Sequence, residues 1–417
     1  MSSAPPTSTF NWWLLTVPID ERIARARIRY SHHVLVNVCD GTHEAWGAAP
    51  LYANAPHRVR ALRPVLERVT GSLDLARPAV AREHCARALT GVPDVCNALD
   101  GALWELEALR AGSSVASLLG SDRSKVEITE QLFADAALEP ETILHVLRRH
   151  GTRALKVKVC GDLPVDLRAL RRVRSAVGRD VHIRIDANRG YTLQTARRLA
   201  LELPSLGIAE WEEPAVGDFE TIARLRRETG LRVVLDESVR TLDDLEQALA
   251  AEALDVLNLK LSRLGGITAA LEFKRRCERA GVGILLGCNE DIGPAMAAVL
   301  HAAAAWQPFE TEGLGWVRLG LDLGSPQPTP VDGRVTVGAA PGWGIQVEPR
   351  SRPCGRVNPP NPVHMSAWSR RFAARSVAQR QHQRLSNALL RMRRLPARRE
   401  EDTYWPLANT RTIREVP

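Results

Sequence analysis

Lysine is scarce in this chain, and its few positions are informative. Of the 56 basic residues, only five are lysine. Three of the five, Lys156, Lys158 and Lys260, end short apolar runs that have the character of β-strands. Arginine keeps its proton near neutral pH, whereas a lysine that is desolvated or close to another cation can release its proton. The three positions therefore indicate proton transfer.

The spacing of these lysines predicts the direction in which each one points. Lys156 and Lys158 are two residues apart on one expected strand, so both point to the same side of it. Two cations this close lower each other's pKa, which makes one of them a usable base near neutral pH. Lys260 follows a later strand, and we expect it to face the pair from the opposite side. The alternative is that the lysines only form ion pairs with nearby carboxylates.

Three acidic residues end three consecutive expected strands. Asp186, Glu212 and Asp236 are 26 and 24 residues apart. If they are buried together without a cation, their carboxylates repel one another and their pKa values rise. Three oxygen ligands without histidine or cysteine favour a hard divalent ion, Mg²⁺ first and Mn²⁺ next. The alternative is that each acid only caps the helix that follows it.

The elements that must position these residues alternate between strands and helices after Ser124. Short apolar runs recur about eight times at intervals of roughly 25 residues, with amphipathic stretches such as Thr192–Leu203 between most of them. The runs are residues 126–129, 154–159, 181–186, 208–211, 232–236, 256–260, 282–287 and 308–312. This pattern favours a (β/α) barrel over an open doubly wound sheet, with active-site residues at the C-terminal ends of the strands.

The first third of the chain has a different pattern. Residues 12–50 contain three strand-like segments, and residues 56–119 show helical periodicity. A sheet followed by helices predicts a small α+β domain. We therefore expect an α+β domain at 1–120, the barrel at 121–320, a further segment at 321–350 and a separate tail at 351–417.

Composition limits the remaining function classes. The chain has no run of 18 apolar residues and no charged-then-apolar leader, which predicts a cytoplasmic protein without a membrane span. Its seven scattered cysteines, without a CxxC pair, are expected to be reduced thiols.

The net charge of the chain is +8, but residues 351–417 alone carry +10, from 14 arginines and four acids. The body is near neutral, so a nucleic-acid surface is not expected there. The tail is interpreted as solvated or disordered, with a gene-model artefact and an anion-binding segment as alternatives.

The ordered set of motifs resembles the enolase superfamily, in particular its muconate-lactonizing-enzyme subgroup, which is similar to mandelate racemase. The matching stretches are Ala154-Leu-Lys-Val-Lys-Val, Asp186-Ala-Asn-Arg-Gly-Tyr-Thr, Trp211-Glu-Glu-Pro, Leu235-Asp-Glu-Ser and Asn258-Leu-Lys-Leu-Ser-Arg-Leu-Gly-Gly. Each motif alone is weak, but their order and one-unit spacing are specific. The resemblance covers residues 12 to 348.

This resemblance implies a fold and a set of roles. The fold is a modified TIM (β/α)7β barrel, with an N-terminal α+β capping domain that the segment after the barrel completes at 321–350. The resemblance implies that Asp186, Glu212 and Asp236 hold Mg²⁺, which grips the carboxylate of a small-molecule substrate and stabilises an enediolate. Lys158 and Lys260 are then the two acid/base groups on opposite faces, and Lys156 is a cationic neighbour. We also expect a homo-oligomer.

The subgroup leaves the reaction open. Two opposed lysines suit a racemase or epimerase that acts on a dipeptide or an N-acylamino acid by 1,1-proton transfer. The loop that contains Asn188 is similar to that of dipeptide epimerases, although Arg189 stands where glutamine is usual. Glu310 and Glu312 resemble the acidic pair that holds a substrate ammonium, and Glu290 resembles a substrate-contacting glutamate.

Three other interpretations of this chain remain. A muconate-type cycloisomerase or an o-succinylbenzoate synthase-like dehydratase would need only one of the lysines as acid/base. From another class, the barrel could be catalytically inert and the basic tail could bind anions. Glu310 and Glu312 could also be solvent-facing or capping acids.

Overall fold

The computed structural model describes residues 9–23, 26–51, 64–121, 123–134, 139–313, 315 and 322–347, with side chains at 18–23 and 26–29 excluded. The basic tail expected at 351–417 lies outside the described residues. Within the described ranges, no helix is long and apolar enough to cross a lipid bilayer.

Seven parallel strands form the central sheet. They are β5 (Glu130–Phe133), β6 (Ala154–Lys158), β7 (His182–Asp186), β8 (Glu210–Glu212), β9 (Arg232–Leu235), β10 (Val256–Leu259) and β11 (Gly283–Leu286), each paired with the next. Residues 309–312 close the sheet into a barrel. The backbone N–H groups of Glu312 and Thr129 donate to Leu286 and Thr311, at 2.8 Å each. The predicted (β/α)7β barrel is therefore confirmed.

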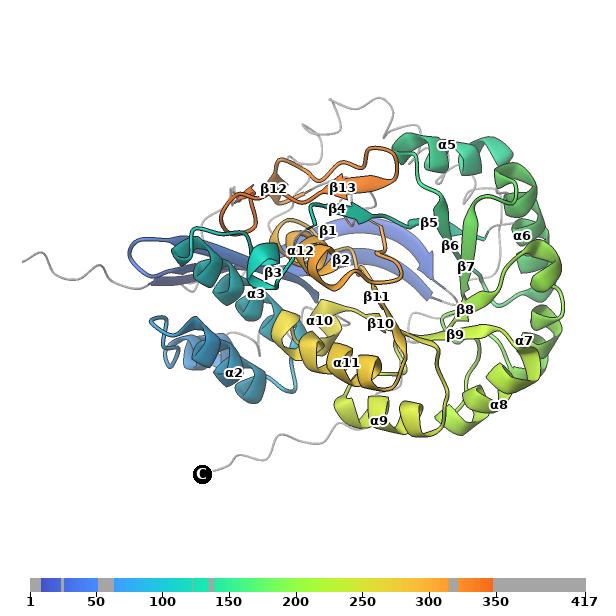
Figure 1. Ribbon diagram of the computed structural model, residues 1–417, viewed down its shortest axis with the longest axis horizontal. Coiled ribbons are helices and arrows are strands. Elements are labelled where there is room, and N and C mark those ends of the chain that lie inside the picture. Colours follow the sequence, from blue (N-terminus) through green and yellow to red (C-terminus); the bar gives the residue numbers. More distant parts are fainter. Residues whose placement is uncertain are drawn as a thin grey trace, which may run out of the picture. The chain divides into compact units, whose positions relative to one another are not determined.

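Helices follow each of these strands and surround the sheet (Figure 1). They are α5 (Pro140–His150), α6 (Leu163–Val177), α7 (Leu193–Ala200), α8 (Phe219–Thr229), α9 (Leu242–Ala250), α10 (Leu261–Leu264), α11 (Ile267–Arg279) and α12 (Pro294–Trp306), with a short 3₁₀ helix at Pro204–Leu206. Side-chain oxygens of Asp162, Thr192, Asp218 and Thr241 accept the free N–H groups at the starts of α6 to α9. These caps fix where each loop at the barrel mouth ends.

The start of the barrel differs from the prediction. Residues 126–129 were expected to form its first strand, but β4 (Lys125–Glu127) pairs antiparallel with β13 (Arg334–Thr336). The first barrel strand is β5 instead. The physical reason is that a segment after the barrel pairs with β4, and local periodicity does not reveal a partner 200 residues away.

The N-terminal domain is a three-stranded antiparallel sheet packed against helices. Its strands are β1 (Thr9–Ile23), β2 (Ala26–Cys39) and β3 (Glu44–Leu51), and its helices are α2 (Pro78–Ala88), α3 (Pro93–Arg110) and α4 (Val115–Leu118). Gly47 lets β3 approach α3 closely, because a Cβ there would lie 1.8 Å from the Ala98 carbonyl oxygen. The predicted α+β cap is confirmed.

The segment after the barrel completes this cap, as predicted. Its strands β12 (Gly324–Ser325) and β14 (Gln346–Val347) pair with each other. Between them, the Trp343 indole N–H donates to the Trp46 carbonyl at 2.8 Å, and its backbone N–H donates to Glu105 at 3.2 Å. The cap also joins the barrel directly, because Asp100 accepts the backbone N–H of Thr268 at the start of α11, at 3.1 Å.

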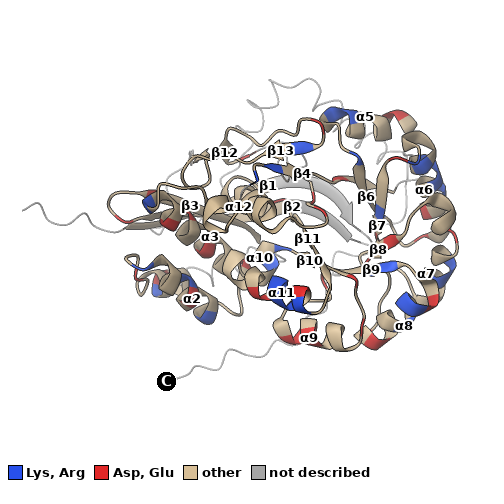
Figure 2. Ribbon diagram, viewed as in Figure 1, with Lys and Arg blue, Asp and Glu red and all other residues tan. Residues whose placement is uncertain are grey.

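The interior of the barrel is divided between apolar and charged side chains. Val234, Val256 and Leu285 form a small apolar cluster on the side of β9 to β11. Charged positions occupy β6, β7 and β8 inside the ring of helices (Figure 2). Buried charge is costly unless it is paired, so the charged side chains in this half of the barrel must be stabilised by ion pairs with one another.

Candidate active site

The barrel mouth gathers the three acids that were predicted as metal ligands. Lys158 pairs in register with Asp186, and Asp186 pairs with Glu212. These residues are therefore the last residues of three neighbouring strands and lie at one level of the barrel. Asp236 follows β9 directly. All three carboxylates are buried, with at most 1% of each residue exposed. Parallel strands have brought together side chains that are 50 residues apart in the chain.

The two candidate acid/base lysines lie on opposite walls of this mouth. Lys158 Nζ lies 2.9 Å from Asp186 and 2.9 Å from the Asn188 side-chain oxygen. Lys260, directly after β10, lies 2.8 Å from Asp236. Strands β7, β8 and β9 separate β6 from β10 in the sheet. Each lysine is therefore paired with a different candidate metal ligand.

Lys156 lies below Lys158 on the same strand and is almost fully buried. Its Nζ lies 2.5 Å from Glu312, 3.7 Å from Asp186 and 3.8 Å from Glu212. Burial lowers its pKa, but Glu212, Glu312 and Asp186 outweigh burial and raise it. The expected lowering of the pKa by the neighbouring lysine therefore does not hold for Lys156, because three carboxylates lie within 4 Å of its Nζ.

The charges at the mouth fit a divalent cation. Burial and the nearby Asp186 raise the pKa of Glu212 to about 8. Burial also raises the pKa of Asp236, but Arg263 and Lys260 outweigh burial and lower the pKa of that carboxyl well below its usual range. Buried carboxylates that repel one another, with oxygen as the only donor type, form the ligand set that a hard divalent ion prefers.

Three residues of the site were missed in the sequence. Arg184 is fully buried in the barrel and binds Glu212, and it donates to Glu310 at 2.9 Å and to Glu312 at 3.0 Å. Asn258 donates to Glu212 at 2.8 Å. Arg263, on α10, binds Asp236. Arg184 and Asn258 could have been found, because each precedes a predicted site residue by two positions and so shares its face.

The placement of Glu310 and Glu312 changes their interpretation. Both point into the barrel, but Glu310 lies at the level of Arg184 and His182, away from the mouth. Glu312 lies higher and is shared by Lys156, Arg184 and Asn258. The alternative that these acids face solvent is wrong, because both are buried. Glu310 is also not placed to hold a substrate ammonium, because its carboxylate lies beside His182, at the start of β7 and away from the mouth.

The remaining predicted contacts lie at the rim of the mouth. Asn188 orients Lys158 through its side-chain oxygen, and its own backbone N–H donates to Asp186 at 2.9 Å. Glu290, in the loop after β11, faces His33 of the capping sheet. Burial lowers the pKa of His33 to about 4 although Glu290 acts to raise it. The cap therefore contributes a buried imidazole beside the loop that carries Glu290.

Comparison with known sequences and structures is consistent with this geometry. The model of the enolase C-terminal domain-like family matches residues 141–351, which is half of the chain. The chain belongs to this family. An L-Ala-D/L-Glu epimerase from Clostridium acetobutylicum is 32% identical over 213 residues, which are 50% of this chain and 59% of that protein. This chain thus matches less than two thirds of that relative's length.

Two further similarities within the enolase family point to different reactions. An o-succinylbenzoate synthase from Geobacillus kaustophilus is 31% identical over 61% of this chain and 68% of that protein. The crystal structure of a dipeptide epimerase from Methylococcus capsulatus, complexed with Mg and the dipeptide L-Arg-D-Lys, is 27% identical. The match between the two structures covers 82% of this chain and 99% of the epimerase chain, with a TM-score of 0.73.

Proposed function

We propose that this protein is a divalent-metal-dependent racemase or epimerase that removes and returns the proton α to a carboxylate. The observation that carries the proposal is the placement of Lys158 and Lys260 on opposite walls of one mouth, each beside a different buried carboxylate. Two bases on opposite faces of one carbon are what inversion by 1,1-proton transfer requires.

In this proposal Asp186, Glu212 and Asp236 hold Mg²⁺, with Mn²⁺ as the alternative. The ion supplies positive charge that stabilises the substrate carboxylate as negative charge develops on it. The similarity to a Mg-containing dipeptide epimerase supports Mg²⁺.

The lysines divide the proton work. Lys158 takes the α-proton of one enantiomer at Nζ, and Lys260 returns a proton to the other face; the reverse reaction exchanges these roles. Asn188 keeps Lys158 in place by accepting its hydrogen bond at 2.9 Å. Lys156 remains protonated and balances the charge of Glu312 and the acids around it.

Dipeptides and N-acylamino acids are the proposed substrates. The epimerase relatives support dipeptides. Glu290 and Asn188 at the rim, with Glu312 behind them, remain the proposed polar contacts, and Glu310 is assigned to the charge network inside the barrel.

The test is α-proton exchange. The protein is incubated with Mg²⁺ in D₂O against a library of dipeptides and N-acylamino acids, and deuterium at the α-carbon is measured by mass spectrometry. We expect exchange with inversion for at least one substrate, and its loss in Asp236→Asn. The proposal fails if no amino-acid derivative exchanges.

A cycloisomerase or dehydratase is the second candidate, supported by the similarity to an o-succinylbenzoate synthase. These reactions need only one lysine as acid/base. They give a product with changed connectivity or with one water less, whereas an epimer keeps its bonds and gains only the mass of the exchanged deuterium. The same mass spectra, combined with chromatography of the product, therefore separate the two candidates.

A further inference from the structure

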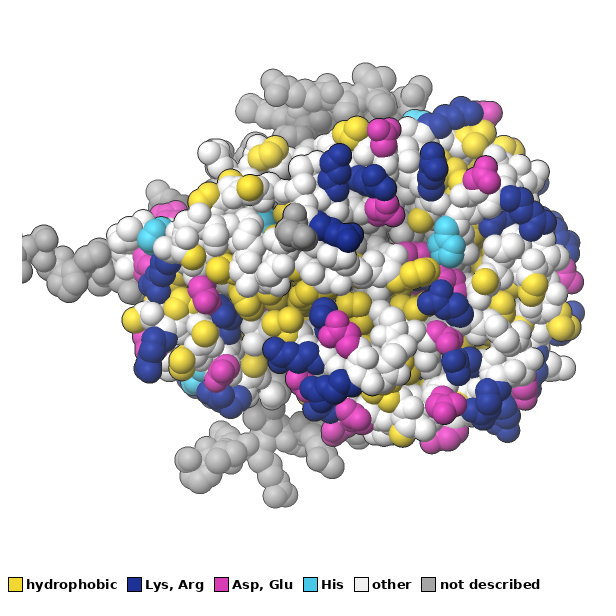
Figure 3. Space-filling model, viewed as in Figure 1, with side chains coloured by type: hydrophobic (Ala, Val, Ile, Leu, Met, Phe, Trp, Pro, Cys, Tyr) yellow, Lys and Arg dark blue, Asp and Glu magenta, His cyan; other side chains and the backbone are white. Residues whose placement is uncertain are grey.

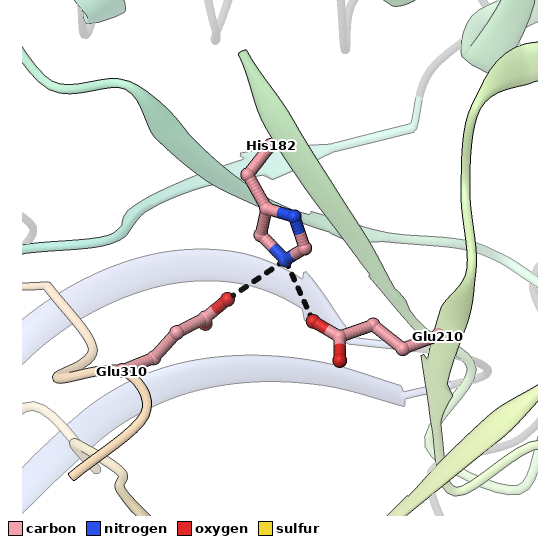
Figure 4. A group of neighbouring side chains, drawn as sticks. All are labelled: His182, Glu210 and Glu310. Carbon is pink, nitrogen blue, oxygen red and sulfur yellow. Dashed lines mark hydrogen bonds and ion pairs between the residues drawn. The ribbon is translucent and has the colours of Figure 1, made fainter. Parts of the chain in front are cut away.

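A second cluster of ionisable side chains lies at the end of the barrel remote from the lysines. His182 is the first residue of β7, Glu210 is the first of β8, and Glu310 lies in the segment that closes the barrel. Both carboxylates turn toward the ring of His182 (Figure 4). Its Nε2 lies 2.6 Å from Glu210 Oε1 and 3.1 Å from Glu310 Oε1.

The cluster has more acceptors than donors. A single imidazole N–H at Nε2 faces two carboxylates, and its hydrogen bond goes to Glu210. Among the described residues, Oε1 of Glu310 accepts no hydrogen bond, although it lies 3.1 Å from His182 Nε2. Both glutamates are more than nine-tenths buried. A buried carboxylate oxygen without a hydrogen bond is costly, and a cation shared by His182 and both glutamates would satisfy this oxygen.

Arginines hold the opposite side of each carboxylate. Oε2 of Glu310 accepts from Arg184 at 2.9 and 3.2 Å. Oε2 of Glu210 lies 3.4 Å from Arg232. In both glutamates, Oε1 is therefore the oxygen presented to His182. Outer partners that orient a carboxylate in this way are typical of metal ligands.

We propose that His182 Nε2, Glu210 Oε1 and Glu310 Oε1 bind a Zn²⁺ ion at this end of the barrel. One imidazole nitrogen and two carboxylate oxygens suit Zn²⁺, whereas Mg²⁺ prefers oxygen alone. The candidate ligand atoms all lie within 4.8 Å of one another. Zinc ligands at about 2.0–2.2 Å from the ion require only small shifts from this arrangement. The half-exposed His182 ring can supply them, since 42% of its side chain is accessible.

Solvent reaches the neighbourhood of this site. Phe309 and Glu310 line a cavity of about 630 Å³ whose other wall includes Lys125 and Arg334. Basic side chains gather over β4 and β13 on this face (Figure 3). The three protein ligands leave at least one position of the ion open, and this cavity offers water or a small anion a way to it. The ion would tie the closing segment to the opposite barrel wall at β7 and β8.

The test uses the full chain, stripped of metal and then held in excess Mg²⁺ to occupy the mouth. Zn²⁺ is titrated by calorimetry, and thermal unfolding is followed with and without Zn²⁺. We expect the wild type to bind one equivalent more than His182→Asn, and to gain in Tm where that variant does not. Glu210→Gln, which keeps the size of the side chain, should bind at least about tenfold more weakly.

The control is His145→Asn, which changes an exposed histidine on α5. This variant should bind Zn²⁺ as the wild type does, which rules out adventitious binding to surface histidines. Circular dichroism checks that each variant is folded. Equal stoichiometry and equal Tm gain in wild type, His182→Asn and Glu210→Gln would overturn the proposal, as would a wild type that binds no Zn²⁺ beyond the Mg²⁺-occupied mouth. In those cases the imidazole, together with Arg184 and Arg232, balances the two glutamates.

Discussion

The two opposed lysines at the mouth are held by different neighbours. Lys158 donates hydrogen bonds to Asp186 and Asn188. Lys260 instead pairs with Asp236, which also binds the guanidinium of Arg263. Neither lysine depends on the other for its position. Removing one should therefore leave the geometry of the other intact, which makes their separate roles measurable.

Lys158→Ala and Lys260→Ala should each abolish inversion, since both bases are needed for it. Each variant should still exchange the α-proton of one enantiomer with D₂O, and the two variants should choose opposite enantiomers. Nuclear magnetic resonance of each pure enantiomer in D₂O measures this. Near wild-type racemisation by Lys260→Ala would instead favour a one-lysine reaction. Lys274→Ala, on α11 and paired with Glu278, is the control and should leave the chemistry unchanged.

Gly287→Ala should impair the reaction without unfolding the barrel. A Cβ at residue 287 would lie 2.2 Å from the Asn258 side-chain oxygen and 2.7 Å from two carbons of Lys260, so Lys260 must move. A displacement of about 1 Å in a catalytic group costs on the order of 10²-fold in rate. Steady-state kinetics should show the loss mainly in kcat, with little change in Tm.

Gly283→Ala is the matched control for this change, because Gly283 is the first residue of β11 and Gly287 directly follows that strand. Its Cβ would meet Val256 and Asp255 only at 3.4 and 3.6 Å, which is ordinary contact. Activity in Gly283→Ala should stay near that of the wild type. Equal activity in the two variants would show that the position of Lys260 is not critical.

At the scale of elements, most of the parallel strands of the barrel could be predicted from the sequence, because these buried strands end in chemically distinctive residues. The positions of Lys158, Asp186 and Glu212 at one level follow from the strand periodicity alone. The pairing of β4 with β13 and the depth of Glu310 could not be predicted. Both depend on contacts between residues more than 100 positions apart, for which local pattern holds no signal.

Helix α3 links the cap to the returning segment through one buried acid. Glu105 accepts the backbone N–H groups of Trp46 and Trp343. Burial raises its pKa to about 8 from an ordinary value of 4.5, although these hydrogen bonds oppose the shift. Between these two pH values the folded protein keeps a proton that the unfolded chain has released. This group therefore lowers the free energy of unfolding as pH rises from 5 to 8, by about 1.4 kcal/mol per pH unit.

Glu105→Gln should flatten this dependence, because glutamine does not titrate. The free energy of unfolding, measured with denaturant between pH 5 and 8, should depend less on pH in this variant than in the wild type. The difference in slope corresponds to about one bound proton. The variant should also be less stable at pH 5, since its amide group cannot accept both N–H groups. Identical slopes in the two proteins would contradict a raised pKa at Glu105.

At the scale of the whole molecule, charge is concentrated in one part of the chain. Residues 351–417 contain 14 of the 51 arginines but only four acidic residues. Ending the chain at residue 350 should leave kcat and KM unchanged, because the site residues all precede that position. If the protein instead works by binding anions through this tail, the truncated chain loses salt-sensitive binding to DNA or to acidic vesicles. Filter binding and vesicle sedimentation at several salt concentrations measure this.

The completion of the cap by Trp343 has a consequence for the order in which this protein is made. The cap strands and α3 leave the ribosome first, but Trp46 and Glu105 must wait for a partner that is translated more than 200 residues later. At about 5–20 residues per second, this delay lasts on the order of ten seconds or more. During that time, Glu105 and the Trp46 carbonyl of the first domain lack this partner while the barrel is still being translated. Chaperone binding to stalled chains should therefore be strongest before residue 343 emerges.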